Sequence, residues 1–296
     1  MDQLRGMQIF RTVAECKSFT LAAERLDLPR PTVTNAVQAI ERQLGVRLLQ
    51  RTTRKVSLTV EGQVYFDRCS RVLADVDDLN NLFSATARPH GVVRVELPER
   101  MAHRQLIPRL PDFFARYPDL QLRVGASDRF ADLVGEGIDC AVRVGTLRDS
   151  GLIAKRIGQM EQINVAAPAY LAAHGTPRTP AELPHHLAVN FYSSQTGRDM
   201  EWEYLDDGVV KTVGMRALVA VASSEAYLAC CRAGLGMIQV PQLGLEPDLA
   251  AGELVEVMPE WRPAPLPVSV VYSHNRHLSA RVRAFVDWVA EVLVVR

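Results

Sequence analysis

The 296-residue sequence has no stretch of about 18 apolar residues, the length that a helix needs to cross a bilayer. Its first residues include the acid Asp2 and no extended apolar segment, so we expect no secretory signal and a cytoplasmic location. The five cysteines are odd in number and show no C-x-x-C spacing, which indicates neither a disulfide framework nor a zinc site. H-E-x-x-H, P-loop and G-x-S-x-G motifs are also missing, so we expect no enzyme activity, no resident metal and no cofactor.

The composition that is present, 48% hydrophobic and 23% charged, is typical of a globular chain with two or three domains. A formal net charge of zero conceals an asymmetry along the chain. Residues 1–66 carry ten bases and six acids, a net charge of +4, and the remaining 230 residues carry −4. This asymmetry indicates a polyanionic partner for the first part of the chain alone.

The segment 18–45 predicts two short helices joined by a tight corner. Ala22 and Ala23 in the first helix are small enough for the close crossing of a helix-turn-helix, although an ordinary helical hairpin has the same pattern. In the second helix, apolar residues recur at steps of four, three and four, and the opposite face is polar and free of acids. Glu41 lies near the inner face, where we expect it to pair locally. The inner face is Val33, Val37, Ile40 and Leu44, and the outer face is Pro31, Asn35, Gln38 and Arg42, with Thr34 at its edge.

A short basic hairpin is predicted after this helix, which we expect to end at Gly45 in a left-handed cap. The stretch VRLLQRTTRKVSLT alternates apolar and basic residues, and its basic residues Arg51, Arg54 and Lys55 fall at the predicted turn. A hairpin of this kind is a wing that contacts phosphates beside the groove, which favours a DNA-binding domain over the ordinary hairpin. The side chains expected to face inward are Leu48, Leu49, Val56 and Leu58.

The stretches SFTLAAERL and AIERQLGVRLLQRTTRKVSLTVEG closely resemble the LysR-type transcriptional regulators, and the resemblance covers nearly the whole chain. It implies a winged helix-turn-helix, a long linker helix and a ligand-sensing body of two α/β lobes, similar to a periplasmic binding protein. The corner departs from the family, because Pro29-Arg30-Pro31 replaces the usual Ser-Pro-Ser or Ser-Gln-Ser. The serine cap is therefore missing, and Pro31 compensates in part because proline suits the first helical turn.

The resemblance sets the expected domains and DNA contacts. We expect a DNA-binding domain at 1–58, a linker helix at 59–88 and an effector-binding domain at 91–296, with one lobe formed by 91–160 and 266–296 and the other by 161–265. Asn35 stands where the family often has arginine, and asparagine favours adenine where arginine favours guanine. The residues expected to contact DNA are Arg30, Thr34, Asn35 and Gln38 at bases, Arg51, Arg54 and Lys55 at phosphates, and Thr32.

The linker segment 59–88 contains no proline and carries an apolar stripe at alternating steps of four and three. One interpretation is a helix packed on its own body. We favour pairing with a second copy of the chain, because continuous heptads usually need a partner helix. The resemblance agrees and implies a homodimer or a homotetramer. The stripe is Tyr65, Cys69, Val72, Val76, Leu79 and Phe83.

The body begins after the break at 89–91 and alternates strands with helices. We predict strands at 92–98, 120–127 and 138–145 with helices at 104–117 and 129–137, an order that implies a parallel sheet. Trp202 and Tyr204 are expected in a hairpin strand, as lobe packing or as a ligand platform. Further strands are predicted at 162–168, 187–192, 211–223, 236–241 and 266–273, and further helices at 224–234 and 279–293.

Ligands collect at the carboxyl ends of strands in open α/β sheets, which locates the expected effector site. Arg100 and Arg143 at two such ends indicate an acidic effector such as a carboxylate. The alternative is that Arg100 closes the cleft itself or points to solvent. The residues expected to contact the effector are Arg100, Met101, Ser127, Arg143, Val144, Gly145, Tyr192, Ser193, Ser223 and Ser224.

The sequence thus predicts a DNA-binding transcriptional regulator controlled by a small molecule, with double-stranded DNA, the effector and further copies of the chain as partners. A regulator of the same fold that responds to redox state through its cysteines is the alternative, although the adjacent Cys230 and Cys231 are more typical of buried small apolar residues. An enzyme on the two-lobed scaffold lacks a recognisable nucleophile–base pair. The histidines form no recognisable metal cluster, and His185-His186 is expected in a surface turn.

Overall fold

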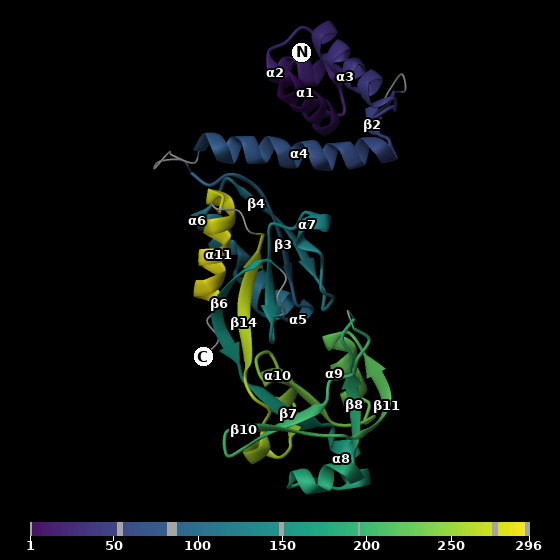
Figure 1. Cartoon of the computed structure of the whole chain (residues 1–296), viewed down its shortest axis with the longest axis vertical. Coiled ribbons are helices and arrows are strands. Elements are labelled where there is room, and N and C mark those ends of the chain that lie inside the picture. Colours follow the sequence, from purple (N-terminus) through teal and green to yellow (C-terminus); the bar gives the residue numbers. More distant parts are fainter. Residues whose placement is uncertain are drawn as a thin grey trace. The chain divides into compact units, whose positions relative to one another are not determined.

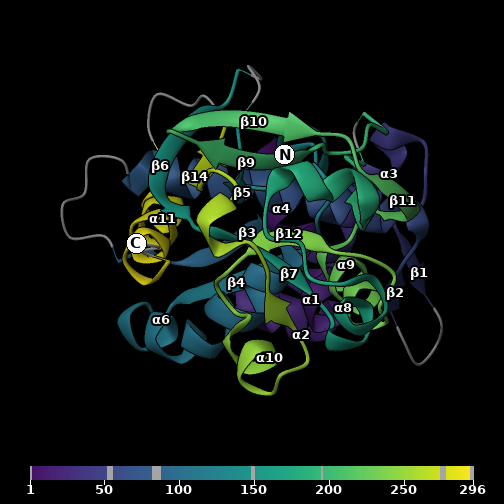
Figure 2. The ribbon, with the colours of Figure 1, turned by 90° about the horizontal axis from the view of Figure 1, so that it is seen from below.

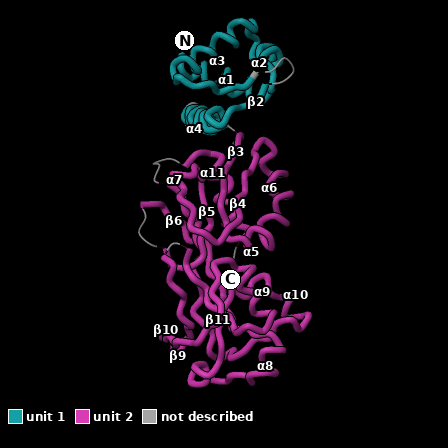
Figure 3. Tube along the Cα trace, turned by 90° about the vertical axis from the view of Figure 1, so that its right-hand side faces the viewer, with its two compact units in different colours: residues 1–87 teal, residues 88–296 magenta. Residues whose placement is uncertain are grey.

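The computed structural model describes residues 2–51, 56–81, 88–147, 151–194, 196–273 and 278–293. The chain divides into two compact units, residues 1–87 and 88–296, which we call the head and the body (Figure 3). Each is described by itself. Within the described residues, no helix is long and apolar enough to cross a membrane.

The head is a three-helix unit followed by a short hairpin and a long helix. Phe10, Val13, Val33 and Val37 are fully buried at its centre, so the predicted inner face of the second helix-turn-helix helix is confirmed for its first half. Leu44 is 44% exposed and does not belong to this core, because the helix ends there and Gly45 turns the chain away at φ 71°. The elements are α1 Gln3–Cys16, α2 Phe19–Leu26, α3 Arg30–Leu44, β1 Leu49–Arg51, β2 Val56–Leu58 and α4 Val60–Asn81.

The helix α4 is shorter in the described chain than the predicted 59–88, because residues 82–87, with Phe83, lie outside the described residues. Its apolar stripe divides in two. The Tyr65 ring meets Phe10 of α1 edge-to-face at 5.1 Å, and Cys69 is buried in the same cluster. The prediction that the whole stripe faces a partner helix is therefore wrong for these first two residues, which the head itself covers. Leu79 further along is 71% exposed.

The first lobe of the body is built on a five-stranded sheet in the order β4-β3-β5-β14-β6 (Figure 1). β3 runs parallel to β4 and β5, as predicted, whereas β14 is antiparallel to both β5 and β6. The expectation of a parallel arrangement is confirmed for the three strands from which it was drawn, and β14, which returns from the second lobe, is the one antiparallel strand among the five of this sheet. The strands are β3 Gly91–Leu97, β4 Leu120–Ala126, β5 Cys140–Val144, β6 Ile153–Met160 and β14 Leu266–Tyr272.

The predicted helices of this lobe differ in extent from those observed. The helical segment expected at 104–117 already begins at Glu99, and the one expected at 129–137 contracts because Asp132 caps it and Gly137 ends it in a left-handed turn. The observed elements are α5 Glu99–Met101, a π-helical turn Ala102–Leu106, a 3-10 turn Ile107–Arg109, α6 Leu110–Arg116, α7 Leu133–Glu136 and α11 Ala280–Val292.

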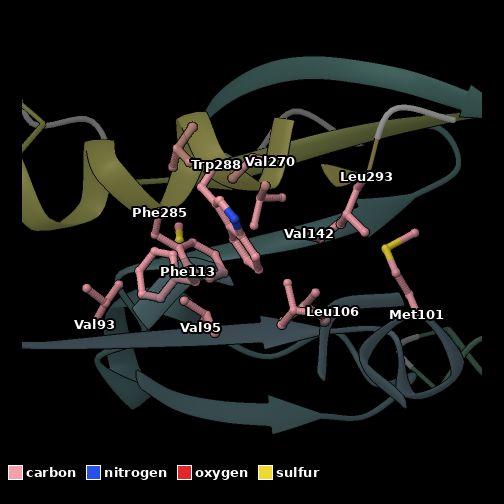
Figure 4. Close-up of a cluster of buried hydrophobic side chains, with 14 of the residues drawn as sticks. Val93, Val95, Met101, Leu106, Phe113, Val142, Val270, Phe285, Trp288 and Leu293 are labelled. Atoms are coloured by element: carbon pink, nitrogen blue, oxygen red, sulfur yellow. The ribbon is translucent and has the colours of Figure 1, made fainter. Parts of the chain in front are cut away.

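An aromatic cluster fills the first lobe between α11 and the sheet (Figure 4). The Phe113 ring lies 4.9 Å from Trp288 and 5.9 Å from Phe285, in tilted and edge-to-face arrangements. The Trp288 indole nitrogen donates a hydrogen bond to Asp112 at 3.0 Å, so this buried ring keeps its polar atom satisfied. The core fixes the sheet whose strand ends form one side of the cleft.

The second lobe contains two small sheets and a hairpin. Strands β12 and β13 flank β7, β11 pairs parallel with β8, and β9 and β10 form the predicted hairpin, visible side by side in Figure 2. The single strand predicted at 211–223 is divided, since the chain turns at 214–215 between two sheets; β6 and β13 were not predicted. The strands are β7 Gln162–Ala166, β8 Leu187–Phe191, β9 Trp202–Asp206, β10 Val209–Val213, β11 Arg216–Val221, β12 Ile238–Pro241 and β13 Val255–Glu256.

Helices and 3-10 turns cover these sheets, and α9 contributes residues to the lining of the cleft between the lobes. Ser223 caps α9, whose residues Tyr227, Leu228 and Cys231 are buried in the lobe core. The chain leaves the first lobe between Met160 and Gln162 and returns to it at Leu266. The helical elements are α8 Pro168–His174, a 3-10 turn Pro180–His185, α9 Ser224–Arg232, α10 Glu246–Ala250 and a 3-10 turn Pro259–Trp261.

Candidate nucleic-acid interface and ligand cleft

The helix α3 begins without a side-chain cap, as predicted. Pro29 stands at the N-cap position and makes no side-chain hydrogen bond, while Pro31 occupies the first turn. The Pro29 carbonyl accepts from the backbone nitrogens of Thr32 at 2.9 Å and Val33 at 3.3 Å. Because proline lacks an N–H, Pro31 removes one of the donors that a serine cap would otherwise satisfy. Arg30 is therefore placed at an exposed helix start.

The outer face of α3 brings the predicted DNA-contacting residues together. Arg30, Thr32, Asn35 and Gln38 are all exposed, whereas Thr34 is half-buried at the edge of the face. Within the described residues, no side-chain hydrogen bond or ion pair is recorded for Arg30, Asn35 or Gln38. Their donors and acceptors are available to a partner, and the face carries hydrogen-bonding groups of the kind that read base edges.

Glu41 joins this helix to the hairpin that follows. Its carboxylate oxygen Oε1 accepts from the backbone nitrogen of Leu48 at 2.9 Å and from that of Leu49 at 3.1 Å. The expected local pairing of Glu41 is confirmed, and its partners are the first residues of the hairpin. The carboxylate fixes the hairpin against α3 through two charge-assisted bonds.

The hairpin itself has the predicted inward side. Leu49 pairs with Leu58 and Arg51 with Val56 in an antiparallel register, and the predicted inward residues Leu48, Leu49, Val56 and Leu58 all pack on the head core. Arg54, Lys55 and the Arg51 side chain lie outside the described residues.

The stretch LTVEG, residues 58–62, begins at the last residue of the hairpin and ends in a glycine that the structure explains. Thr59 donates its hydroxyl to the Arg47 carbonyl at 2.8 Å and accepts from the Gly62 nitrogen at 2.8 Å, which starts α4. A Cβ at Gly62 would overlap the carbonyl oxygen of Leu48. The hairpin and α4 therefore meet at a distance that only glycine allows.

A cleft of about 1240 Å³ separates the two lobes of the body. Most of the predicted effector-contacting residues line it. Tyr192 and Ser223 are not among its lining residues: the Tyr192 backbone nitrogen donates to the Val221 carbonyl at 2.9 Å, and the Ser223 hydroxyl caps α9, so their contact with an effector stays a prediction. The predicted residues that do line the cleft are Arg100, Met101, Ser127, Arg143, Val144, Gly145, Ser193 and Ser224.

Arg100 reaches from the first lobe to the second. Its Nη1 lies 3.2 Å from Glu225 Oε1 of α9, and its Nη2 donates to the Gly244 carbonyl at 2.9 Å. The side chain is 14% exposed, and burial lowers the pKa of its guanidinium, an effect that the Glu225 carboxylate opposes. The interpretation that Arg100 closes the cleft matches these contacts better than a free ligand-binding group does.

Arg143 is the more deeply buried arginine of the cleft, at 7% exposure. Its Nη2 donates to the Ala131 carbonyl at 3.4 Å, and its guanidinium lies 5.3 Å from the centre of the Phe130 ring. Within the described residues, no carboxylate lies at ion-pair distance from it. Burial lowers the pKa of Arg143, and the nearby Glu96 charge offsets this in part. An anion bound beside Arg143 would therefore compensate a buried charge.

The third arginine of the cleft, Arg129, is already paired. Both of its terminal nitrogens contact the Glu136 carboxylate, one of them at 2.8 Å, and this bidentate contact raises the pKa of Arg129. Ser127 is committed too, since its hydroxyl donates to Glu96 at 2.6 Å. Arg143 is thus the cleft arginine with the most unused capacity to bind an anion.

The second lobe presents aromatic side chains and acids to the cleft. The Phe191 and Tyr227 rings meet edge-to-face at 5.4 Å. Trp202 is 6% exposed and packs in the lobe core, as one of the two predicted alternatives states, but it also lines the cleft. In the described structure its indole nitrogen has no hydrogen-bond acceptor. Asp199 accepts from the Asn190 amide at 2.6 Å on the same wall.

Sequence reasoning missed the network behind this wall. The Gln239 amide donates to Asn164 at 2.8 Å and to the Glu203 carbonyl at 2.7 Å, and it accepts from the Glu203 nitrogen at 2.9 Å. Asn164 is fully buried. The sequence offers no periodic signal for such a network, because its members come from β7, β9 and β12.

All five cysteines are free. Cys69, Cys140 and Cys231 are buried, and burial raises the pKa of Cys69 to about 11 and that of Cys231 to about 12. The reactive thiolate is therefore disfavoured at these positions. Within the described ranges, no group of three histidine, cysteine or acidic residues is arranged to hold a metal ion.

Comparisons with known proteins agree with this architecture. Residues 4–63 match the bacterial regulatory helix-turn-helix protein model of the lysR family, and residues 86–294 match the LysR substrate binding domain. The regulator YhjC of Escherichia coli K12 is 38% identical over 99% of this chain and 98% of its own. A transcriptional repressor of Pseudomonas aeruginosa strain UCBPP-PA14 is 39% identical over 99% of this chain and 92% of its own.

Solved structures give the same result. The LysR-type transcriptional regulator CrgA of Neisseria meningitidis is 31% identical, covers 97% of both chains and has a TM-score of 0.59. The Vibrio cholerae virulence activator AphB is 29% identical over 98% of this chain and 99% of its own, with a TM-score of 0.58. The chain therefore belongs to the LysR family of transcriptional regulators, with an amino-terminal helix-turn-helix and a two-lobed substrate binding domain.

Proposed function

We propose that this chain is a sequence-specific DNA-binding transcriptional regulator without enzyme activity, in which α3 enters the major groove. The exposed, acid-free face that starts at Arg30 carries this proposal, because the side chains of Arg30, Asn35 and Gln38 make no hydrogen bond or ion pair within the described residues. Arg30, Thr32, Thr34, Asn35 and Gln38 contact bases, and Arg51, Arg54 and Lys55 contact phosphates. The proposed domains are 1–58 for DNA, 59–88 for the linker and 91–296 for the effector.

A second copy of the chain completes the proposed DNA-binding unit. Val60, Val64 and Leu79 on α4 are 80%, 60% and 71% exposed, an apolar surface that the head does not cover. A partner helix would bury these side chains and present two copies of α3 to two half-sites. The proposed assembly is a homodimer, or a homotetramer when dimers pair through the body.

The proposed effector is an organic acid bound in the cleft. Arg143 carries this part of the proposal, because it is a buried guanidinium with a long 3.4 Å hydrogen bond and no carboxylate at ion-pair distance in the described chain. Phe130 offers an apolar surface beside it, and Asp199 makes the opposite wall acidic. The acid group of the effector is therefore directed to the first lobe and its apolar part to the rings of the second.

A binding-site selection tests the DNA-reading proposal. Replacing Asn35 by alanine should change the base preferred at one position, whereas replacing Arg54 should weaken all sites and lower the salt slope by about one unit. An unchanged preferred sequence in Asn35→Ala would refute base reading by this residue.

Calorimetric titration with a panel of organic acids tests the effector proposal. Arg143→Gln should abolish the binding of every acid that binds the wild type. Arg129→Gln is the matched control, because Arg129 lines the same cleft but already pairs with Glu136. Equal binding by wild type and Arg143→Gln, or no binding of any acid to the wild type, would overturn it. If peroxide instead modified Cys16 or Cys230 and changed DNA binding, the redox alternative would take its place.

A further inference from the structure

Among the described residues, polar contacts cross the cleft between the two lobes near the starts of α5 and α9. These two helices are labelled in Figures 1 and 3. Arg100 of the first lobe contacts Glu225 at 3.2 Å and the Gly244 carbonyl at 2.9 Å, both in the second lobe. Asp128 of the first lobe accepts from the Ser224 backbone nitrogen of α9 at 2.6 Å. We call these five residues the inter-lobe clamp.

Asp128 binds the beginnings of two helical segments with one carboxylate. Its Oδ2 accepts from the first residue of α9, Ser224, and its Oδ1 accepts from the first residue of α5, Glu99, at 3.3 Å. Both donors lie among the backbone N–H groups that a helix leaves unpaired at its start, where negative charge is favoured. The carboxylate thus holds together two elements of different lobes that each need an acceptor.

The Gly244 carbonyl is the second acceptor of the Arg100 guanidinium, beside the Glu225 carboxylate. Its φ of +84° lies in the left-handed region, and a Cβ there would lie 3.5 Å from Arg104 and 3.6 Å from the Arg100 guanidinium. These are ordinary contacts, so the strain of a side chain at this position would come from the backbone conformation and not from lack of space. This backbone conformation presents the Gly244 carbonyl to Arg100.

We propose that Arg100 and Asp128 are positioning residues that hold the two lobes together when no effector is bound, rather than residues that bind the effector. This deepens the proposed effector function and rests on it only for the consequence: because Arg100 and the start of α9 are already occupied, the acid group of the effector is left to Arg143. Arg100 is 14% exposed and Glu225 is 45% exposed, so solvent screens the contact from one side. A clamp of this kind can open and close.

Hydrogen exchange of the full-length, effector-free protein tests the clamp. Glu225→Gln changes a residue that does not line the cleft, and Asp128→Asn removes one charge with little change in volume. Each should raise amide exchange at least about fivefold in both lobes, at 99–106 and at 223–228, because losing either contact frees both ends. Asp132→Ala is the matched control: Asp132 lines the same cleft and caps α7 within its own lobe through Gly135 at 3.0 Å, so only exchange near 132–137 should rise.

The double variant Arg100→Glu with Glu225→Arg should return exchange part of the way to the wild-type level, because it restores the charge pair but not the hydrogen bond to the Gly244 carbonyl. If Glu225→Gln and Asp128→Asn change exchange only in the lobe that carries the substitution, the clamp is refuted. A conservative change at the half-exposed Glu225 keeps the test open even if the Asp128 variant does not fold. The measurement involves no effector, so a failure of acid binding to Arg143 would overturn the effector proposal and leave the clamp result standing.

Discussion

The head and the body hold the arginines proposed for their functions in opposite ways. In the head, Arg30 is exposed at the start of α3 and has no recorded partner within the described residues. In the body, Arg143 is 7% exposed and Arg100 is held by two acceptors of the other lobe. An exposed arginine stays hydrated without a partner, so it loses little free energy before a polyanion binds. A buried arginine has lost its hydration, so it needs a compensating acceptor from the chain or from a ligand.

Gly62→Ala tests whether the head depends on the close approach of α4 to the hairpin at Gly62. The new Cβ would overlap the Leu48 carbonyl, so we expect a loss of about 3 kcal/mol in the unfolding free energy of the head, measured by urea denaturation. Gly6→Ala is the control in the same unit, since its Cβ would meet only Ile40 at 3.5 Å, an ordinary contact. That variant should be neutral or slightly more stable. Equal unfolding free energies of the two variants would show that the head does not depend on this close approach.

Glu41→Ala removes a carboxylate that the head uses internally. Two backbone donors, on Leu48 and Leu49, would lose their acceptor, which should cost about 2 kcal/mol of unfolding free energy. Since the wing would then move independently of α3, affinity for all DNA sites should fall together. Glu41→Gln keeps an acceptor oxygen and should lose less. A variant with normal stability and altered base preference would show instead that Glu41 reads DNA.

Arg30→Ala should weaken DNA discrimination without changing the unfolding free energy of the head. Because Arg30 is exposed and without a recorded partner in the described chain, its loss should change the unfolding free energy by less than about 0.5 kcal/mol. Discrimination at one base pair should fall by about 1–2 kcal/mol, measured by competition binding with operators changed at that position. A uniform loss of affinity at every operator would assign Arg30 to phosphate contact.

The unfolding free energy of the head should depend on the protonation of the Cys69 thiol at alkaline pH. Burial raises its pKa from 9.0 to about 11, so below pH 9 both the folded and the unfolded chain keep the proton. Above pH 9 the unfolded chain loses it first, and stability should fall by about 1 kcal/mol between pH 9 and pH 10. Cys69→Ala should make this part of the stability curve flatter. An identical slope in the variant would show that another group is responsible.

The sequence by itself determined the head and the order of the body. Val33 and Val37 recur at helical spacing and are buried, and the polar face opposite them follows from the same period. The missing cap at Pro29 and the end of α3 at Gly45 are also local properties, decided by the covalent structure of proline and glycine. Local rules also placed β3, β4 and β5 in one parallel group.

Only the tertiary structure decided which arginine of the cleft has no carboxylate partner among the described residues. Arg100 and Arg143 look alike in the sequence, each at the end of a strand, but Arg100 meets residues 125 and 144 positions away and Arg143 does not. The return of β14 beside β5, the division of the α4 stripe and the Gln239 network have the same origin. These features depend on which distant segments share a neighbourhood, and no period or cap along the chain encodes that. Packing of the two lobes gave Arg100 its partners, whereas Arg143 contacts only its own lobe among the described residues.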